Sequence, residues 1–202
     1  MRHYFISKEH QESDYFTFIT TFQNKSFTFK SCSDVFSKNQ VDYGSLVLIK
    51  SIIEHGEIFN GKVLDMCCGY GPIGIILSKF LNIDVYFADI NKTAVELSEE
   101  NCKLNGTKPK FVICSDMFLD VKDTFKHIVS NPPIKTGKAK LFEFVDGAFE
   151  CLEDGGTLTV VIKKNLGEES LKKYLISKFD NCEIWERDKG YYILHSTKTM
   201  KA

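Results

Sequence analysis

Proline and net charge are both scarce in this sequence. It contains 4 prolines among 202 residues, and 26 basic against 27 acidic side chains leave a formal charge of −1. The scarcity of proline, together with the lack of repeats and low-complexity tracts, excludes a long linker and favours one compact unit. The near-neutral charge excludes a global field that attracts nucleic acid, so contact with RNA or DNA must use a local basic patch.

Long apolar runs and a leader sequence are missing too. Residues 1–10 are polar, and the longest apolar stretches are far too short to cross a bilayer. We therefore expect no membrane segment and a cytoplasmic location. The hydrophobic content of 43% and the charged content of 26% are close to those of ordinary globular domains.

The cysteines form neither a disulfide framework nor a metal-binding pattern. Their number is odd, no Cys-x-x-Cys occurs, and the five histidines do not cluster with them. Thiols scattered through apolar segments are typical of a reducing compartment, so we expect reduced thiols and no metal site. The cysteines are Cys32, Cys67, Cys68, Cys102, Cys114, Cys151 and Cys182.

The first part of the chain has the pattern of a hairpin followed by a helix. Phenylalanines recur at period two in residues 15–30, around a polar turn, as in a β-hairpin with one apolar face. Residues 42–55 carry an i, i+3, i+4 apolar stripe that starts at Asp42, a residue suited to cap a helix. We predict an N-terminal β-hairpin appendage over residues 1–40, packed on a larger domain over residues 41–202 that holds the functional site.

From residue 62 onward, strands and helices alternate, which predicts an α/β fold with a parallel sheet covered on both faces. A short turn at Asp188, Lys189 and Gly190 joins the last two strands, so one of them must run antiparallel. A seven-stranded, mostly parallel sheet with a terminal antiparallel hairpin resembles the Rossmann-like fold of class I S-adenosylmethionine-dependent methyltransferases. We predict strands near 62–66, 84–89, 110–114, 127–130, 157–162, 181–186 and 190–195, and helices near 72–81, 92–105, 138–153 and 168–179.

A glycine-rich turn follows the first of these strands. Asp65 ends the strand, and Cys67, Gly69 and Gly71 lead into a helix that starts at Pro72. Glycine lets the backbone approach a ligand closely, and proline fits the first turn of a helix. Ligands of open α/β sheets bind at the carboxyl ends of the strands, where this turn lies.

Two more acidic residues follow the next two strands. Asp89, followed by Ile90, is placed to accept the hydroxyls of a ribose, and Asp116, followed by Met117, to accept an adenine amino group. One glycine-rich turn or one strand-end aspartate is weak evidence, because such an aspartate is usually a helix cap. Three carboxylates in this order favour a cationic nucleoside over a pyrophosphate, since Asp65 directly precedes the turn.

The fourth strand of the sheet runs into Asn131, Pro132, Pro133 and Ile134. Two prolines stiffen the turn and hold Asn131 in a fixed relation to the Pro132 carbonyl. An amide oxygen and a carbonyl can accept both hydrogens of an exocyclic amine. They steer its delocalised lone pair toward a methyl donor and stabilise the positive charge that develops. Asn-Pro-Pro is only a turn in most proteins, but its place at a strand end favours the catalytic interpretation.

Lysines gather near the same edge of the predicted sheet. Lys135, Lys138 and Lys140 follow the Asn-Pro-Pro turn, and Lys163 and Lys164 end the fifth strand. Such a cluster can bind phosphates in a salt-dependent way. A solvated rim of helix starts explains the same pattern equally well.

These motifs together resemble the ribosomal RNA small-subunit methyltransferase C-like family, which carries the methyltransferase small domain, and most of all its short single-domain bacterial members. The resemblance implies S-adenosylmethionine as the cofactor, the N2 amine of a guanine in ribosomal RNA or the small ribosomal subunit as the acceptor, and a segment from Phe36 to Ser45 that closes over the cofactor. Similar sequences usually have glycine in place of Cys67. The matching pieces are residues 35–37, 41–45, 65–74, 89, 116, 130–134 and 189–192.

The motif leaves the substrate open. Related Asn-Pro-Pro enzymes methylate adenine N6, guanine N2 or the side-chain amide of protein glutamine, and all of these acceptors are planar nitrogens. An aromatic residue after the prolines is common among adenine enzymes, so Ile134 weakly disfavours adenine. A non-catalytic module that binds RNA or the ribosome is a further alternative. It is favoured by Cys67 and disfavoured by the intact Asn131 motif.

Overall fold

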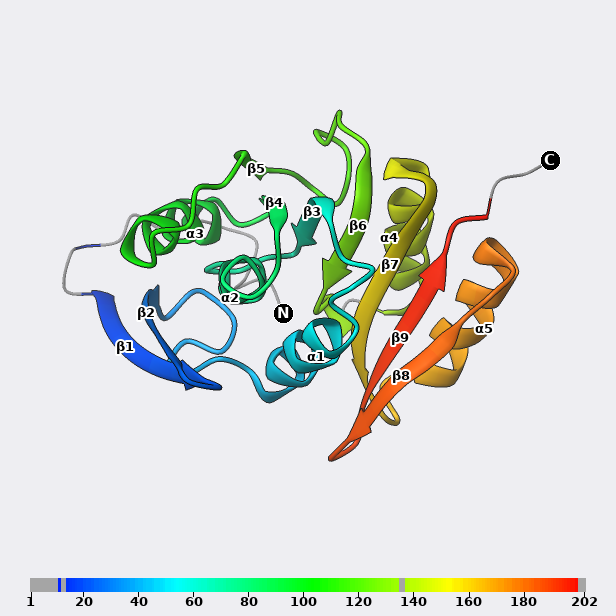
Figure 1. Ribbon diagram of the computed structural model, residues 1–202, viewed down its shortest axis with the longest axis horizontal. Helices are drawn as coiled ribbons and strands as arrows, with labels where there is room; N and C mark the ends of the chain where they lie inside the picture. The colour runs from blue at the N-terminus through cyan, green and yellow to red at the C-terminus, as the bar shows by residue number, and fades with distance from the viewer. Residues whose placement is uncertain (1–10, 12–13, 135–136, 200–202) are drawn as a thin grey trace.

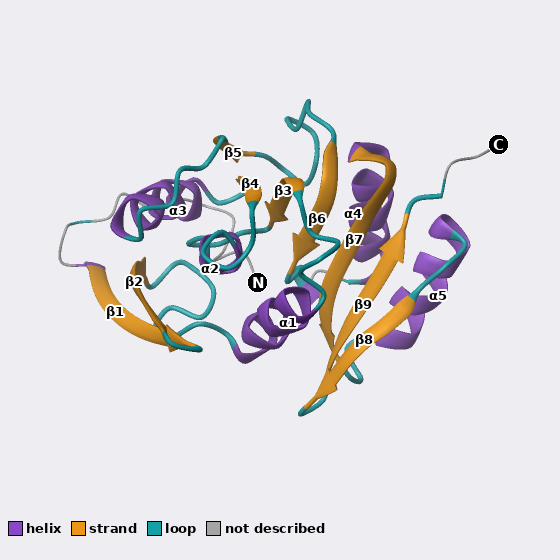
Figure 2. Cartoon of the chain, viewed as in Figure 1, coloured by secondary structure: helices purple, strands orange, loops and turns teal. Residues whose placement is uncertain are grey.

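A twisted seven-stranded sheet runs through the molecule and is covered by helices on both faces (Figure 1). The structure is a computed structural model that describes residues 11, 14–134 and 137–199. A separate two-stranded hairpin lies at one side (Figure 2). Within the described residues, no helix has the length and apolar character needed to cross a membrane.

The strands and helices alternate along the chain as the sequence predicted. The hairpin consists of β1 (Tyr15–Phe22) and β2 (Lys25–Cys32). The strands of the sheet are β3 (Gly61–Met66), β4 (Ile83–Asp89), β5 (Phe111–Cys114), β6 (Phe125–Ser130), β7 (Leu152–Lys163), β8 (Glu183–Asp188) and β9 (Tyr191–Thr197). The helices are α1 (Tyr43–Glu54), α2 (Pro72–Leu77), α3 (Lys92–Leu104), α4 (Lys138–Cys151) and α5 (Glu168–Phe179).

The order of the strands across the sheet is β5-β4-β3-β6-β7-β9-β8. From β5 across to β7, each strand is parallel to its neighbour, whereas β9 is antiparallel to both β7 and β8. The turn between β8 and β9 holds Lys189 and Gly190 at φ angles of 44° and 81°, the two positive angles that a tight hairpin turn needs. The predicted fold class, a mostly parallel sheet with a terminal antiparallel hairpin, is confirmed.

Two predicted boundaries are wrong. Helix α2 ends at Leu77 rather than near 81, because the chain tightens into turns over residues 78–82 to enter β4. Strand β7 begins at Leu152 rather than near 157. Gly155 and Gly156 suggest a turn before a strand, but they lie inside β7, where the pairing with β6 shifts register. Glycine in a strand often marks such a bulge.

Alternate residues of the central strands point to opposite faces of the sheet and lie in two separate hydrophobic cores. One face of the sheet packs against α1, α2 and α3 through residues such as Val63, Phe87 and Val129. The other face packs against α4 and α5 through residues such as Leu64 and Ile128. This two-sided burial explains why the strands are continuous apolar runs in the sequence.

The hairpin shares the first of these cores. Phe27 and Phe29 of β2 are buried in it. Helix α3 also holds the edge of β2, since the Asn101 side chain bonds the backbone N–H and carbonyl of Lys30 at 2.6 and 2.9 Å. Asn105 does the same for Thr28 at 3.0 and 2.8 Å. The hairpin is therefore packed firmly on the sheet domain, and the division at residues 40 and 41 stays a prediction.

Two buried histidines lie on the α1 face of the sheet. His127 Nδ1 is 2.8 Å from the Thr157 hydroxyl, and His195 Nδ1 is 2.9 Å from the Thr159 hydroxyl. Burial lowers the pKa of His127 to about 4 and that of His195 to about 3, from an ordinary value of 6.5. Both rings are therefore neutral at pH 7, because burial disfavours the charged form and no carboxylate among the described residues offsets it.

These two pKa values predict a loss of stability in mild acid. Below pH 6.5 the unfolded chain binds protons on both rings, whereas the folded chain binds them only near pH 4 and 3. The free energy of unfolding should therefore fall between pH 6.5 and 4, by up to about 1.4 kcal/mol per pH unit for each histidine. Urea unfolding of the wild type, His127→Gln and His195→Gln at several pH values measures this dependence.

Each variant should lose stability at pH 7 and show a shallower pH dependence than the wild type. Carboxylates titrate in all three proteins, so the difference isolates the imidazoles. Parallel curves for the three proteins would rule out the buried neutral histidines as the cause.

Candidate active site at the carboxyl edge of the sheet

The turn that follows β3 contains three residues with a left-handed backbone conformation. Cys67, Gly69 and Gly71 have φ angles of 59°, 56° and 87°. At Gly71 the positive φ favours glycine, and so does the lack of space, since a Cβ there would lie 3.1 Å from the side chains of Ile75 and Ser98. A Cβ on Gly69 would meet nothing within 4 Å. The front of the turn is therefore open space that a ligand can enter.

Asp65 ties this turn to the helix behind it. Its side chain is fully buried, and Oδ2 accepts the N–H of Gly74 in α2 at 2.9 Å. Its Oδ1 has no hydrogen-bond partner within the described part of the chain. Burial, with Asp89 nearby, raises the pKa of Asp65 to about 8. At pH 7 this carboxyl group is therefore largely protonated, and a cation beside it would favour the ionised form.

Asp89 lies directly against the glycine-rich turn. One carboxylate oxygen accepts the N–H of Gly69 at 2.8 Å, and the other accepts that of Asn91 at 2.9 Å. Burial raises the pKa of Asp89, and these hydrogen bonds act in the opposite direction. Ile90 is half-buried, and its carbonyl accepts from the Cys114 thiol at 3.4 Å.

The third predicted carboxylate lies farther out on the rim. The Ser115 N–H bonds the carbonyl of Asp89 at 2.9 Å, which brings the loop after β5 beside β4. Asp116 itself is exposed, and Met117 is half-buried with a φ of 49°. The structure thus brings Asp65, Asp89 and Gly69 together and leaves the Asp116 side chain in solvent.

In the described part of the chain these acidic side chains have no direct ion-pair partner, although the charge of Lys140 acts on Asp116. Among the described residues, no lysine or arginine forms an ion pair with Asp65, Asp89 or Asp116. In the same part of the chain, no group of three or more His, Cys, Asp or Glu side chains could hold a metal ion. The site is therefore acidic and suits a cationic ligand.

Asn131 lies at the end of β6, next to the glycine-rich turn. The Ser130 hydroxyl donates to the Met66 carbonyl at 2.6 Å, which joins the ends of β6 and β3. The Asn131 amide nitrogen donates to Asp42 Oδ2 and to Ser45 Oγ, both at 3.0 Å. Pro132 is buried and Pro133 is exposed, while Ile134 is half-buried against the core on the α4 side.

The sequence predicts Asp42 as a helix cap and places Asp42 and Ser45 in the segment expected to close over the cofactor, but it gives neither a contact with Asn131. The structure places both beside Asn131. It also shows a role for Tyr70, which is buried and donates to the carbonyls of Ser37 and Gln40 at 3.3 and 3.1 Å. Tyr70 thereby fastens the segment before α1 to the glycine-rich turn. In the sequence, the signal for this role of Tyr70 is a large aromatic residue between two glycines.

The cysteines of the turn are not nucleophiles. Burial raises the thiol pKa of both Cys67 and Cys68 far above the ordinary value, with nearby Asp89 and Asp65 adding to the effect. The thiolate is therefore not formed at neutral pH. All seven cysteines are free.

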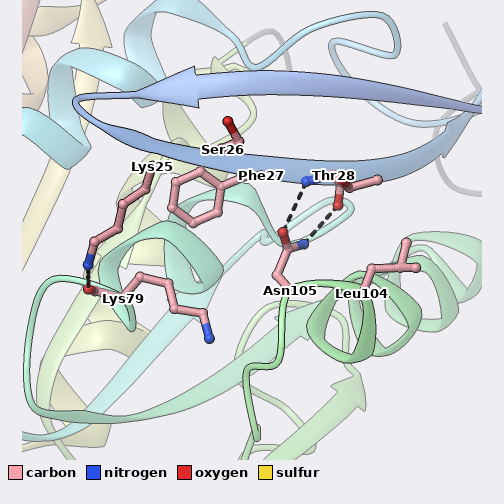
Figure 3. Close-up of a pocket in the computed structure, with 7 residues that line it drawn as sticks. All are labelled: Lys25, Ser26, Phe27, Thr28, Lys79, Leu104 and Asn105. Atoms are coloured by element: carbon pink, nitrogen blue, oxygen red, sulfur yellow. Dashed lines mark hydrogen bonds between the residues drawn. The ribbon is translucent and has the colours of Figure 1, made fainter.

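A hollow lies at the opposite edge of the sheet, where α2 and α3 end (Figure 3). Its volume is about 440 Å³. Its polar groups bond one another, since Asn105 bonds Thr28 and the Lys25 ammonium donates to the Lys79 carbonyl (Figure 3). This hollow has no acidic lining and is separate from the site. It is lined by Lys25, Ser26, Phe27, Thr28, Lys79, Leu104 and Asn105.

Comparison with known proteins identifies the family. The family model of the methyltransferase small domain matches residues 26–195. The chain belongs to this family. The resemblance drawn from the sequence motifs is therefore confirmed.

Similar proteins include one of the same length and several that are longer. The uncharacterized protein YbxB of Bacillus subtilis (strain 168) is 40% identical over 199 residues, covering 97% of this chain and 98% of YbxB. Ribosomal RNA small subunit methyltransferase C of Hamiltonella defensa is 30% identical over 185 residues, covering 87% of this chain and 52% of that protein. The chain thus spans about half the length of such methyltransferase C relatives.

One solved structure is similar in both fold and sequence. It is the 16S rRNA N2 methyltransferase RsmC of T. thermophilus, in complex with AdoMet and guanosine. It superposes with a TM-score of 0.82 at 25% identity, covering 91% of this chain and 50% of that chain. The shared fold therefore takes in most of this chain and half of that protein.

The left-handed conformation of Cys67 gives a testable prediction. Cys67→Gly should change the free energy of unfolding by no more than about 1 kcal/mol, because relief of strain offsets the added backbone freedom of glycine. Cys67→Val should destabilise by about 2 kcal/mol, because a β-branched residue is strained at positive φ. Denaturant unfolding measures both, with Cys67→Ala as the control for loss of the thiol. Equal stabilities of the valine and alanine variants would contradict the argument.

Proposed function

We propose that this chain binds S-adenosylmethionine at the glycine-rich turn and directs its methyl group to the N2 amine of a guanine in small-subunit ribosomal RNA. The observation that carries the proposal is the Asn131 amide, whose nitrogen is engaged by Asp42 and Ser45, so that its oxygen is left to accept from a substrate. The similarity to an RsmC that holds AdoMet and guanosine supports the same chemistry.

The residues of the turn fit the cofactor. S-adenosylmethionine when bound supplies an electrophilic methyl group on a cationic sulfur. Gly69 leaves room for it, Asp89 accepts from the ribose hydroxyls, and the unpaired oxygen of Asp65 favours a positively charged neighbour. The exposed Asp116 is free to accept from the adenine amine. Cys67, Gly71, Ile90, Met117 and Asn131 complete the proposed cofactor site.

The Asn-Pro-Pro turn fits an amine acceptor. The amine of guanine is a weak nucleophile because its lone pair is delocalised into the ring. The Asn131 side-chain oxygen and the Pro132 carbonyl accept its two hydrogens, which localises the lone pair and stabilises the positive charge that develops on nitrogen. Pro133 stiffens the turn, and Ile134 packs against one face of the flat base. Much of the rate comes from positioning.

A basic and aromatic rim beside Asn131 supports RNA as the substrate. The Tyr43 and Tyr191 rings lie 5.8 Å apart. Lys189 Nζ is 4.8 Å from the centre of the Tyr43 ring, and Lys163 Nζ is 5.6 Å from that of Tyr191. Aromatic rings and ammonium groups together suit unstacked bases and phosphates. Lys164 and Lys138 are exposed, Lys140 pairs with Glu143 at 2.9 Å, and Lys135 lies outside the described residues.

Two variants separate cofactor binding from transfer. Asp89→Ala should lose S-adenosylmethionine binding in a calorimetric titration. Asn131→Ala should keep most of the binding, since Asn131 is one of many residues around the cofactor, and lose methyl transfer by on the order of a hundredfold or more, because it removes one of two acceptors of the developing charge. Transfer is measured as tritium from labelled cofactor into unmodified small-subunit RNA, followed by nucleoside analysis for N2-methylguanosine.

The outcomes distinguish the alternatives. A label that survives ribonuclease identifies a protein acceptor, and N6-methyladenosine in the digest identifies an adenine enzyme. Wild-type protein that binds RNA but no cofactor is a non-catalytic module. Each of these results would overturn the proposed reaction.

The rim predicts a salt-dependent RNA affinity. The double variant Lys163→Ala with Lys189→Ala should bind RNA more weakly and lower the slope of log affinity against log salt by about 1 to 2, since each lysine neutralises one phosphate. S-adenosylmethionine binding should not change. The matched control is Lys103→Ala with Lys108→Ala, two exposed lysines at the other edge of the sheet. Equal slopes for the two double variants would show that the lysines of the rim do not bind the phosphates of RNA.

A further inference from the structure

We propose that Asp42 and Ser45 position the catalytic amide of Asn131 and that the Asp42 charge polarises it. This inference rests on the proposed methyl transfer, and it assigns a function to two residues outside the Asn-Pro-Pro motif. Both belong to the start of α1, far from Asn131 in the sequence.

The contacts fix which way the amide faces. Asp42 Oδ2 lies 3.0 Å from the Asn131 side-chain nitrogen, and a carboxylate can only accept a hydrogen bond. The NH₂ end of the amide must therefore point at Asp42. Ser45 Oγ takes the second N–H at 3.0 Å. With both hydrogens engaged, the oxygen is the end of the amide that remains for a substrate amine. Within the described residues, this oxygen accepts no hydrogen bond, since both side-chain bonds of Asn131 are made by its nitrogen.

The position of Asp42 is itself fixed by the helix. Its Oδ2 also accepts the backbone N–H of Ser45 at 3.2 Å and so caps α1. The positive end of the helix dipole stabilises the negative charge there. A Cβ on Gly44 would lie 2.7 Å from the Tyr191 ring and 3.0 Å from Asp42 Oδ2. The start of α1 is therefore pressed tightly against β9.

Further contacts hold the same helix end in place. The Tyr43 hydroxyl donates to Asp188 Oδ2 at 2.7 Å, in the hairpin of β8 and β9. Asn131 is thus oriented by a rigid helix rather than by a loop. Rigid supporting contacts of this kind are what keep a reacting group within a fraction of an ångström of its productive geometry.

The charge of Asp42 has a chemical consequence. A carboxylate that accepts from the amide N–H favours the resonance form with more negative charge on the amide oxygen. That oxygen then stabilises more strongly the positive charge that develops on the substrate nitrogen. Asp42 does not touch the substrate in this scheme, so it is a positioning residue that acts through Asn131.

Three variants separate this role from capping. Asp42→Ser keeps a good helix cap but is too short to reach Asn131. It should keep the melting temperature within a few degrees and lower kcat by roughly 10- to 100-fold at a nearly unchanged KM for S-adenosylmethionine. Asp42→Asn keeps both the cap and the reach and removes the charge, so kcat should fall less. Ser45→Ala should lower kcat and keep the cap.

A double-mutant cycle decides whether the effect passes through Asn131. In the Asn131→Ala background, Asp42→Ser should cause no further loss of kcat, because the group on which it acts is gone. Additive losses would overturn the proposal, as would an Asp42→Ser enzyme with wild-type kcat or with a loss that appears only in KM.

A readout without turnover keeps this test apart from that of the proposed function. The side-chain amide resonances of Asn131, assigned by their disappearance in Asn131→Ala, should be shifted and slow to exchange in the wild type. They should move to the values of a solvated amide in Asp42→Ser. Solvated values in the wild type would refute the positioning contacts. Shifted, slowly exchanging Asn131 resonances in a wild-type protein that methylates no RNA would instead refute the proposed function and leave the positioning contacts standing.

Discussion

Hydrogen bonds from the glycine-rich turn and from the helix behind it to two acidic side chains are the constraint on which the site depends. Asp89 holds the N–H of Gly69, and Asp65 holds that of Gly74 at the start of the helix behind. Both acids come from the ends of neighbouring parallel strands, so their spacing is set by the sheet and not by the loop. A turn with several left-handed residues is costly to order, and these bonds select one conformation of it.

Most of the fold was readable from the sequence, because the signals are local. Period two located the N-terminal hairpin, the alternation of apolar runs with helical patterns located the strands of the sheet and the described helices, and the Asp188 to Gly190 turn revealed the antiparallel hairpin. The two wrong boundaries involve tertiary effects. Gly155 and Gly156 have the pattern of a turn, yet pairing with β6 absorbs them into a strand as a bulge. Helix α2 stops early because the chain must reverse toward β4.

The candidate site was only partly readable. Strand-end carboxylates and the Asn-Pro-Pro turn stand out because each combines a residue type with a place at the edge of the sheet. Asp42 does not stand out, since it lies 89 positions from Asn131 and its capping role already accounts for it. The left-handed φ of Cys67 was also hidden, although the glycine of similar sequences at this position has a simple explanation in that angle. Contacts between distant segments appear only in the folded chain.

The packing of Trp185 gives the protein a built-in optical probe. Trp185 is the single tryptophan of the chain, and its indole is stacked between the rings of His55 and His195 at centroid distances of 4.0 and 3.7 Å. His55 is the residue that ends α1, the helix whose other end carries Asp42. The emission of one fluorophore therefore reports how α1 sits on the sheet. Motion of the helix during ligand binding can be followed in the unlabelled protein, with no dye and no substitution.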